Sequence, residues 1–228
     1  KFGTLLASHG HGDHLAGVHY YASQRSLMRL AVPRVCVPIE IVEPLERIFA
    51  AWREIEDYDL QVELHGVAPG DELALDSRGI LAVAERSVHR VPSLAWTIER
   101  ESHSLLPEFQ GLAGEEIGRL RKQGVTVTQA KRTPWLCVTG DTQIDYFLSS
   151  PRCRSARVLV HEVTSWDQQR DVETTRKWGH THVKEMIEAS ERFEGDALVL
   201  VHRSLRHSKA QAEHLVAEQF PASVRDRV

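Results

Sequence analysis

Three histidines and an aspartate lie close together near the start of the chain, in the string Ser8-His9-Gly10-His11-Gly12-Asp13-His14. His9 and His11 are two positions apart, so an extended segment turns both imidazoles to the same side. Asp13 and His14 follow where we expect the chain to bend into a helix, and they can face a second ion. Imidazole and carboxylate ligands together suit zinc and similar divalent metals. A histidine-rich surface loop is the alternative, but the density of ligands at a strand end favours a metal site.

Three further candidate ligands are distant in the sequence, and each one comes at the end of an apolar run that is typical of a strand. They are His89, Asp141 and His202. Open α/β sheets place ligands at the edge where the carboxyl ends of the strands meet. A lone histidine in a strand is more often structural, so each of these assignments depends on the others. We therefore expect the three residues to join the His9–His14 string at one sheet edge.

Short apolar runs alternate with amphipathic stretches along the chain, which favours a layered α/β architecture. No repeat or Gly/Ser linker divides the 228 residues, so we expect a single domain over 1–228. Residues 100–133 are polar and punctuated by glycine, and we expect an irregular loop there that serves as a lid or substrate-binding insertion. Strands are predicted at 3–8, 34–38, 62–64, 79–88, 94–99, 135–139, 158–162 and 197–202, and helices at 14–29, 43–53, 114–123, 144–149, 180–192 and 209–218.

The composition sets limits on the class of protein. The net charge of −4 gives no overall field that favours nucleic acid, although local basic patches remain possible. No run of about 18 apolar residues exists, so we expect no membrane span. The three cysteines, Cys36, Cys137 and Cys153, have neither zinc-ribbon nor redox spacing. We therefore expect reduced thiols and a cytoplasmic protein.

The string at 9–14 resembles the signature of the metallo-β-lactamase superfamily, and Val88-His89, Thr139-Gly140-Asp141-Thr142 and Leu200-Val201-His202 are similar to its later metal motifs in order and spacing. This resemblance implies an α/β fold, the four-layer αβ/βα sandwich, with two Zn²⁺ ions where two sheets meet; Mn²⁺ or another divalent metal is the alternative. The ligands it implies are His9, His11 and His89 for one ion, Asp13, His14 and His202 for the other, and Asp141 as the bridge.

Within the superfamily the chain is most similar to the ribonuclease Z branch. His161-Glu162-Val163-Thr164 resembles its His-Glu-Ala-Thr motif, and Gly179-His180-Thr181 resembles its Gly-His-Ser motif. The resemblance implies that a zinc-bound hydroxide, oriented by Asp13, attacks phosphorus, and that His180 protonates the leaving group while Glu162 fixes the imidazole. The alternative is that Glu162 pairs with a surface arginine and His180 caps the following helix.

Two other pairs of residues have weaker assignments. Ser204 and Arg206 match the branch's His-x-Ser-x-Arg motif and could bind a substrate phosphate, although a solvated arginine is equally consistent with the sequence. Trp166 and Trp178 flank the segment between Glu162 and His180 and could line a pocket mouth. Tryptophans are more often part of a core or a rim than a substrate platform.

The chain departs from the branch in its arm and its N-terminal strands, and also at two single residues, Val163 in place of alanine and His207 in place of the usual tyrosine. Members that process tRNA carry a long glycine- and proline-containing arm, and no such motif stands between His89 and Asp141, so we expect weak cleavage of pre-tRNA. In the family several strands precede the metal motif, so we expect that some N-terminal strands are missing from this numbering and that residues precede Lys1. A homodimer is left open.

These observations predict a metal-dependent hydrolase, a phosphodiesterase or ribonuclease Z-like endonuclease whose substrate is a phosphodiester, with RNA as one candidate. The first alternative is a hydrolase of small esters, thioesters or lactones from the same superfamily. The second is a non-catalytic metal-binding scaffold, which the complete set of seven candidate metal ligands makes the less favoured alternative. Metal analysis of the purified protein separates the scaffold from the enzymes.

Overall fold

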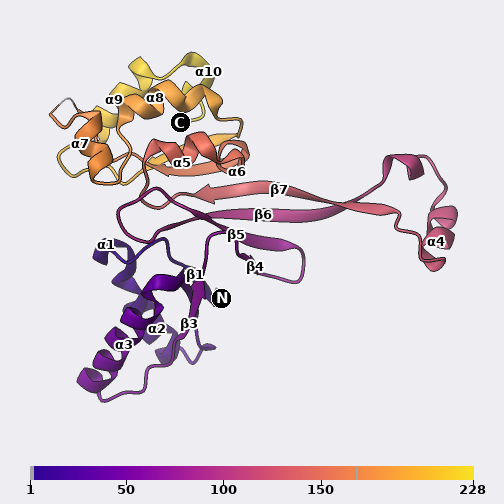
Figure 1. Cartoon of the computed structure of the whole chain (residues 1–228), viewed down its shortest axis with the longest axis horizontal. Coiled ribbons are helices and arrows are strands. Elements are labelled where there is room, and N and C mark those ends of the chain that lie inside the picture. Colours follow the sequence, from indigo (N-terminus) through magenta and orange to yellow (C-terminus); the bar gives the residue numbers. More distant parts are fainter. Residues whose placement is uncertain (1–2, 168) are drawn as a thin grey trace.

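The computed structural model describes residues 3–167 and 169–228, and it contains two β-sheets packed between two layers of helices (Figure 1). The smaller sheet is parallel, with the strand order β1-β2-β3. Val35, Cys36 and Val37 of β2 are fully buried, as expected for a central parallel strand that is covered on both faces. The elements of this half are β1 (Thr4–Leu6), α1 (Gly12–Leu15), α2 (Gly17–Leu27), β2 (Arg34–Pro38), η1 (Ile39–Ile41), α3 (Val42–Glu56) and β3 (Glu63–Val67).

The larger sheet has the strand order β4-β5-β6-β7-β8-β9; its pairs are antiparallel as far as β7 and parallel from β7 to β9. Its strands are β4 (Glu72–Ala74), β5 (Ile80–Arg86), β6 (Leu94–Leu105), β7 (Thr128–Val138), β8 (Val158–Glu162) and β9 (Ala197–Val201). The helices of this half are η2 (Pro107–Phe109), α4 (Gly114–Lys122), α5 (Ile144–Ser149), α6 (Pro151–Ser155), α7 (Val172–Lys177), α8 (Val183–Ala189), η3 (Ser190–Arg192), α9 (Lys209–Gln219) and α10 (Ala222–Arg225).

Three apolar clusters hold the layers together. One lies between the smaller sheet and α2 and α3, where Val18 and Phe49 pack with Val35. A second lies between the larger sheet and its helices and includes Phe147 and Met186. The third, which includes Trp96, lies between the two sheets. This helix–sheet–sheet–helix order confirms the predicted α/β sandwich, and the predicted single domain stays a prediction.

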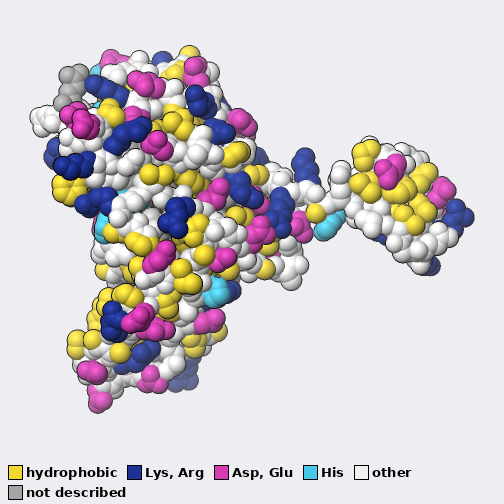
Figure 2. All heavy atoms as spheres, in the orientation of Figure 1, with side chains coloured by type: hydrophobic (Ala, Val, Ile, Leu, Met, Phe, Trp, Pro, Cys, Tyr) yellow, Lys and Arg dark blue, Asp and Glu magenta, His cyan; other side chains and the backbone are white. Residues whose placement is uncertain are grey.

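Residues 100–133 are not the irregular loop that we expected. Strands β6 and β7 continue past the sheet as a two-stranded ribbon, paired from Trp96–Val138 out to Leu105–Thr128, with α4 at its tip. Figure 1 shows this arm pointing away from the rest of the molecule. In Figure 2 hydrophobic side chains gather on the tip, where Phe109, Ile117 and Leu120 are half-buried. The pairing of β6 with β7 keeps this polar, glycine-containing stretch regular.

Two predicted helices begin at different residues. The predicted helix at 14–29 starts earlier, at Gly12, so Asp13 and His14 lie in α1. The predicted helix at 180–192 starts later, at Val183, because His182 caps it: Nδ1 of His182 accepts from the Lys184 N–H, and the Glu185 carboxylate accepts from the His182 N–H. His180 therefore lies three residues before Val183, the first residue of the helix. Within the described residues no helix is both long enough and apolar enough to cross a membrane.

Candidate metal centre

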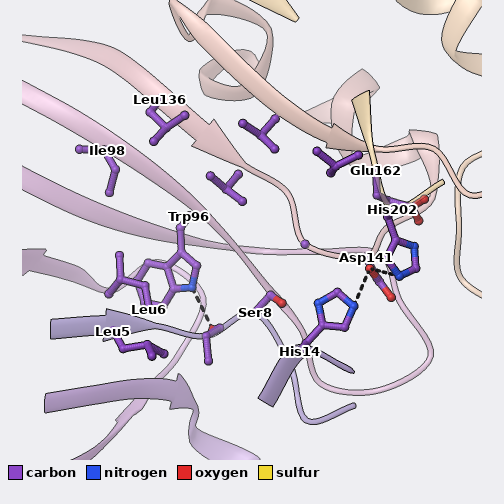
Figure 3. A pocket seen from close by; sticks show the side chains of 15 residues that line it. Leu5, Leu6, Ser8, His14, Trp96, Ile98, Leu136, Asp141, Glu162 and His202 are labelled. Atoms are coloured by element: carbon purple, nitrogen blue, oxygen red, sulfur yellow. Dashed lines mark hydrogen bonds and ion pairs between the residues drawn. The ribbon is translucent and has the colours of Figure 1, made fainter. Parts of the chain in front are cut away.

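The seven predicted metal ligands come from the ends of four strands and lie together where the two sheets meet. His9 and His11 follow β1 and lead into α1, which carries Asp13 and His14. The other three follow strands of the larger sheet: His89 comes after β5, Asp141 after β7 and His202 after β9. Figure 3 shows His14, Asp141 and His202 pointing toward one another from these separate elements.

One group of ligand atoms comes from His9, His11, His89 and Asp141, which offer atoms that all lie within 4.8 Å of one another. Nε2 of His9 is 3.0 Å from Nδ1 of His11, and Nε2 of His89 is 3.5 Å from the same atom. Oδ2 of Asp141 is 3.6 Å from Nε2 of His9. Zinc–nitrogen bonds in a tetrahedral site imply neighbouring ligand atoms about 3.4 Å apart. The spacing of this group therefore fits one metal ion.

A second group consists of Asp13, His14 and His202. Oδ2 of Asp13 is 3.6 Å from Nε2 of His14 and 3.7 Å from Nε2 of His202. Oδ1 of Asp141 lies 3.3 Å from Nε2 of His14 and 3.5 Å from Nε2 of His202. Asp141 therefore turns one carboxylate oxygen toward each group, as a bridging ligand would.

The side chain of Asp141 also lacks the partners that a buried carboxylate needs. The residue is 2 % exposed, and its Oδ1 accepts no hydrogen bond from the described residues. A buried, unpaired carboxylate oxygen is costly unless a cation or a hydrogen-bond donor compensates it. Together with the donor set around it, this oxygen fits a divalent metal.

The electrostatics of the cluster favour the protonation states that metal ligands require. Burial, opposed by Asp141, lowers the pKa of His9 to about 3, so this imidazole is neutral at neutral pH. Burial also lowers the pKa of His89. Partial burial opposes ionisation of Asp13, but its own backbone N–H and the imidazoles of His14 and His202 outweigh it and lower the pKa of that carboxyl. Neutral imidazoles and ionised carboxylates are the forms that bind metals.

Three residues that sequence reasoning did not single out hold the imidazoles in place. Nδ1 of His9 lies 3.0 Å from the Ser8 hydroxyl, and Nδ1 of His89 donates to the Gly179 carbonyl at 2.8 Å. The Thr164 hydroxyl donates to Oε2 of Glu162 and so accepts from Nδ1 of His202, at 2.8 Å. Each contact leaves the Nε2 atom facing the cluster. Hydrogen bonds of this kind orient metal-binding histidines and fix their tautomers.

The backbone is constrained at two glycines and at one ligand. Gly140 has φ +58, and a Cβ there would lie 2.5 Å from Cβ of Ser8. Gly179 has φ +82, and a Cβ there would lie 2.6 Å from Nδ1 of His89. His202, which has a Cβ, also adopts a left-handed φ of 61. Conformations that non-glycine residues rarely adopt are concentrated at functional sites.

Glu162 and His180 form a pair beside the cluster. Glu162 is 1 % exposed, and its Oε1 lies 2.9 Å from Nδ1 of His180 and accepts from the backbone N–H groups of Thr142 and Thr181. Burial raises the pKa of Glu162. Burial tends to lower the pKa of His180, but the hydrogen bond and charge of Glu162 outweigh it and raise that pKa. Glu162 thus pairs with an imidazole rather than with a surface arginine.

His180 also stands close enough to the cluster to be considered a ligand. Its Nδ1 is 3.8 Å from Oδ2 of Asp141, and His180, Asp141 and His202 offer a third group of neighbouring ligand atoms. At this distance from Asp141 the imidazole of His180 could serve either as a proton donor or as a metal ligand. The nitrogen that approaches Asp141 is Nδ1, and the proton that it shares with Glu162 prevents that same atom from binding a metal ion, so we treat His180 as the candidate proton donor.

The remaining candidates lie around this centre. Ser204 and Arg206 are on the loop after β9, and Nε of Arg206 donates to the Ser204 hydroxyl at 3.3 Å. Trp166 is buried in the core under α8, whereas Trp178 is largely exposed. Trp166 therefore has the core position that is more usual for a tryptophan, and its indole donates to the Val163 carbonyl there.

A pocket of about 640 Å³ extends from the cluster into the space between the two sheets. Figure 3 shows His14, Asp141 and His202 at one end and apolar side chains such as Ile98 and Leu136 along the rest. Nε1 of Trp96 donates to the Ala7 carbonyl across the pocket and links the sheets. An apolar surrounding of this kind lowers the local dielectric and strengthens the attraction between Asp141 and any bound cation.

Comparisons with known proteins agree with this geometry. Residues 2–203 match a family model described as the Beta-lactamase superfamily domain. The chain is 32 % identical over 219 residues to tRNase Z TRZ1 of Arabidopsis thaliana, which covers 95 % of this chain and 78 % of the relative. The fold is similar to that of YhfI from Bacillus subtilis, a metallo-beta-lactamase fold protein, with a TM-score of 0.63 at 14 % identity over 95 % of this chain and 71 % of that one. It is also similar to the short form of human tRNase Z, with a TM-score of 0.59 at 19 % identity over 90 % of this chain and 73 % of that one.

Proposed function

This chain belongs to the ribonuclease Z-like branch of the metallo-β-lactamase superfamily, and from that premise we propose that its histidine–aspartate cluster binds two zinc ions and cleaves phosphodiester bonds in RNA. The protein is a metal-dependent phosphodiesterase of the ribonuclease Z type. The observation that carries the two-metal proposal is Asp141, which presents one oxygen to His9 and the other to His14 and His202.

The proposed ligands divide as the distances suggest. His9, His11 and His89 would hold one ion, Asp13, His14 and His202 the other, and Asp141 would bind both. When bound, two divalent ions supply a water of lowered pKa and neutralise charge that develops on phosphate oxygens. Asp13 is the most exposed of these carboxylates and would orient the attacking water.

His180 would donate the proton that the departing oxygen requires. Glu162 holds Nδ1 of His180 and helps to raise its pKa, so the imidazole keeps its proton at higher pH and leaves Nε2 free to face the substrate. An alkoxide is a poor leaving group, so RNA cleavage depends strongly on such a donor. Ser204 and Arg206 lie on the loop after His202, and we assign them to the substrate phosphate.

We propose that the arm is a substrate-binding element rather than a lid. In Figure 1 it points away from the metal cluster, so it does not cover the site. The last turn of α4 at its tip carries Arg119, Arg121 and Lys122 and is basic, whereas Glu115 and Glu116 lie in the first turn of the same helix. Because an arm exists here without a glycine–proline motif, the reason to expect weak pre-tRNA cleavage no longer holds. The substrate that we propose is a structured RNA such as pre-tRNA.

Two measurements on the purified protein test this proposal. Metal analysis is expected to find about two equivalents of zinc or manganese per chain. Cleavage is then compared on a pre-tRNA with a 3′ extension, an aryl phosphodiester, an aryl ester and a thioester. We expect metal-dependent turnover of the first two. Turnover of only the ester or the thioester would show that the protein is a small-ester hydrolase and not a nuclease. A folded protein that binds no metal would contradict both enzyme assignments and leave the non-catalytic scaffold as the explanation.

We also infer that the protein works in a reducing compartment such as the cytoplasm. Cys36, Cys137 and Cys153 are free and buried, which is how cysteines are kept where disulfides do not persist.

A further inference from the structure

Trp178 differs from the other four tryptophans of the chain because it is the exposed one. Its exposed fraction is 47 %, whereas Trp96 and Trp166 are buried and Trp52 and Trp135 are half-buried. The guanidinium of Arg90 lies over its ring, with Cζ 4.6 Å from the ring centroid. Trp178 thus presents an indole ring at the surface with a cation over it.

The Arg90–Trp178 pair is attached directly to the proposed active site. Arg90 follows His89, and Trp178 precedes Gly179, whose carbonyl oxygen accepts from Nδ1 of His89 at 2.8 Å. The two segments are in close contact, since a Cβ on Gly179 would lie 3.1 Å from the backbone nitrogen of Arg90. The rings of His89 and His180 are 5.2 Å apart between centroids. The pair therefore stands at the rim of the cluster, beside both a proposed metal ligand and the proposed proton donor.

We propose that Trp178 and Arg90 form a platform on which a nucleobase next to the scissile phosphate stacks. This inference rests on the proposed function, and it names the part of the RNA that the rim recognises. Every base has a π-face, so an exposed tryptophan binds bases with little preference for sequence. Arg90 fixes the indole by a cation–π contact and adds positive charge where the RNA backbone passes.

The platform is a binding and positioning element, not part of the chemistry. The indole of Trp178 has no described contact with the metal ligands or with His180, whereas the charge of Arg90 tends to lower the pKa of His180, by less than Glu162 and Asp141 raise it. Its loss should therefore raise the KM for RNA more than it lowers kcat. Loss of one base–aromatic stack corresponds to a decrease in affinity of about 5- to 150-fold.

The test uses the metal-loaded protein and a pre-tRNA with a 3′ extension. We expect Trp178→Ala to raise KM within that range, Trp178→Phe to keep most of the affinity because it retains a ring, and Arg90→Ala to have an intermediate effect. Tyr20→Ala is the matched control, because Tyr20 is an aromatic residue with 68 % exposure on α2, outside the cluster. Circular dichroism checks that each variant is folded, and Trp178→Phe keeps the test valid if Trp178→Ala does not fold.

Substrates with one abasic nucleotide identify the base. The abasic site is placed in turn at each position flanking the cleavage site. At one position the abasic substrate should weaken binding to the wild-type protein as much as Trp178→Ala weakens binding to the intact substrate. At that position, combining the abasic substrate with Trp178→Ala should not weaken binding further. Two results would overturn the platform but not the proposed function, provided that the wild type is active. One is an unchanged KM in Trp178→Ala. The other is a full further loss of affinity in Trp178→Ala at every abasic position. A metal-loaded wild type that does not cleave RNA would overturn the proposed function and, with it, the platform.

Discussion

Oε1 of Glu162 lies 2.9 Å from Nδ1 of His180, and the same oxygen accepts two backbone N–H groups, from Thr142 and Thr181. The two backbone N–H groups thus hold the carboxylate in place independently of the imidazole. His180 in turn has one ring nitrogen committed to Glu162 and the other available. This arrangement fixes the tautomer of a proton donor next to the candidate metal centre.

We expect His180→Ala to reduce RNA cleavage by about 10²- to 10⁴-fold, the usual contribution of a positioned general acid, without changing the metal content. Cleavage of an aryl phosphodiester should decrease much less, because a nitrophenolate leaves without help. Single-turnover rates on both substrates, with metal analysis of the same samples, measure this difference. Loss of one metal equivalent in His180→Ala would instead make His180 a ligand.

The raised pKa of His180 predicts the shape of the pH profile. Because the acid must carry its proton, kcat should fall as the pH rises through that pKa. In Glu162→Gln the hydrogen bond and charge that raise the pKa are weakened, so this decrease should begin at a lower pH. An identical alkaline limb in both proteins, measured by kcat on RNA, would show that another group sets it.

Asp141→Asn should abolish binding of one metal ion and weaken that of the other, because Asp141 faces both groups of ligands. Binding to the folded state raises stability, by about 4 kcal/mol when the free metal is 1,000 times its Kd. The wild-type melting temperature should therefore fall on chelation, whereas that of Asp141→Asn should change little. His214→Ala, an exposed histidine on α9, serves as the control and should keep the wild-type metal content.

Thr164→Val removes the hydroxyl that joins Glu162 to His202 while keeping the shape of the side chain. Loss of such an outer contact to a metal-binding histidine lowers metal affinity or activity by about 10- to 100-fold. Thr164→Ser should recover most of it, because the hydroxyl is restored. Competition with a chelating dye measures the affinity, and equal values for the valine and serine variants would exclude the proposed role of the hydroxyl.

The buried imidazole of His161 should make the folded protein less stable in weak acid. Burial lowers its pKa from 6.5 to about 4, so the folded protein keeps the imidazole neutral. Its contribution is complete above pH 6.5 and is lost as the pH falls toward about 4, because only the unfolded chain takes up the proton. The loss amounts to about 3 kcal/mol at most. The free energy of unfolding of the wild type relative to that of His161→Leu, measured with urea, should fall by up to this amount between these pH values, and a constant difference would refute the assignment.

Replacing 106–127, the part of the arm beyond the Leu105–Thr128 pair, with a short turn should leave the body folded and its aryl phosphodiesterase activity intact. The KM for pre-tRNA should rise at least about tenfold, equivalent to ~1.4 kcal/mol, and depend less on salt. A milder variant, Arg121→Glu, changes only charge and should act in the same direction. Unchanged kinetics on pre-tRNA in both variants would exclude the arm from substrate binding.

Much of the cluster could be predicted from the sequence, because its ligands stand at strand ends and parallel strand ends share an edge. The strands Arg34–Pro38 and Val158–Glu162 were predicted with the observed boundaries, since continuous apolar runs bounded by polar residues define them well. The fold class followed from the same alternation. Whether the seven ligands bind metal stays a prediction.

The supporting contacts could not be predicted in the same way. Gly179 orients His89 through a carbonyl oxygen, which carries no side-chain signal, and Thr164 reaches His202 from a different strand end. The ribbon at residues 100–133 could not be predicted, because polar residues in a ribbon exposed on both faces lack the alternation that marks a half-buried strand. Long-range pairing, which local patterns do not report, keeps that ribbon regular.

The position of Asp141 has a consequence for how the molecule unfolds. The ligands of both groups come partly from the smaller sheet, through His9 and His14, and partly from the larger one, through Asp141 and His202. A bound ion therefore cross-links the two halves of the sandwich without a covalent bond. The metal-loaded protein should melt in one concerted transition, and chelation should separate it into two, with the three-stranded half melting first.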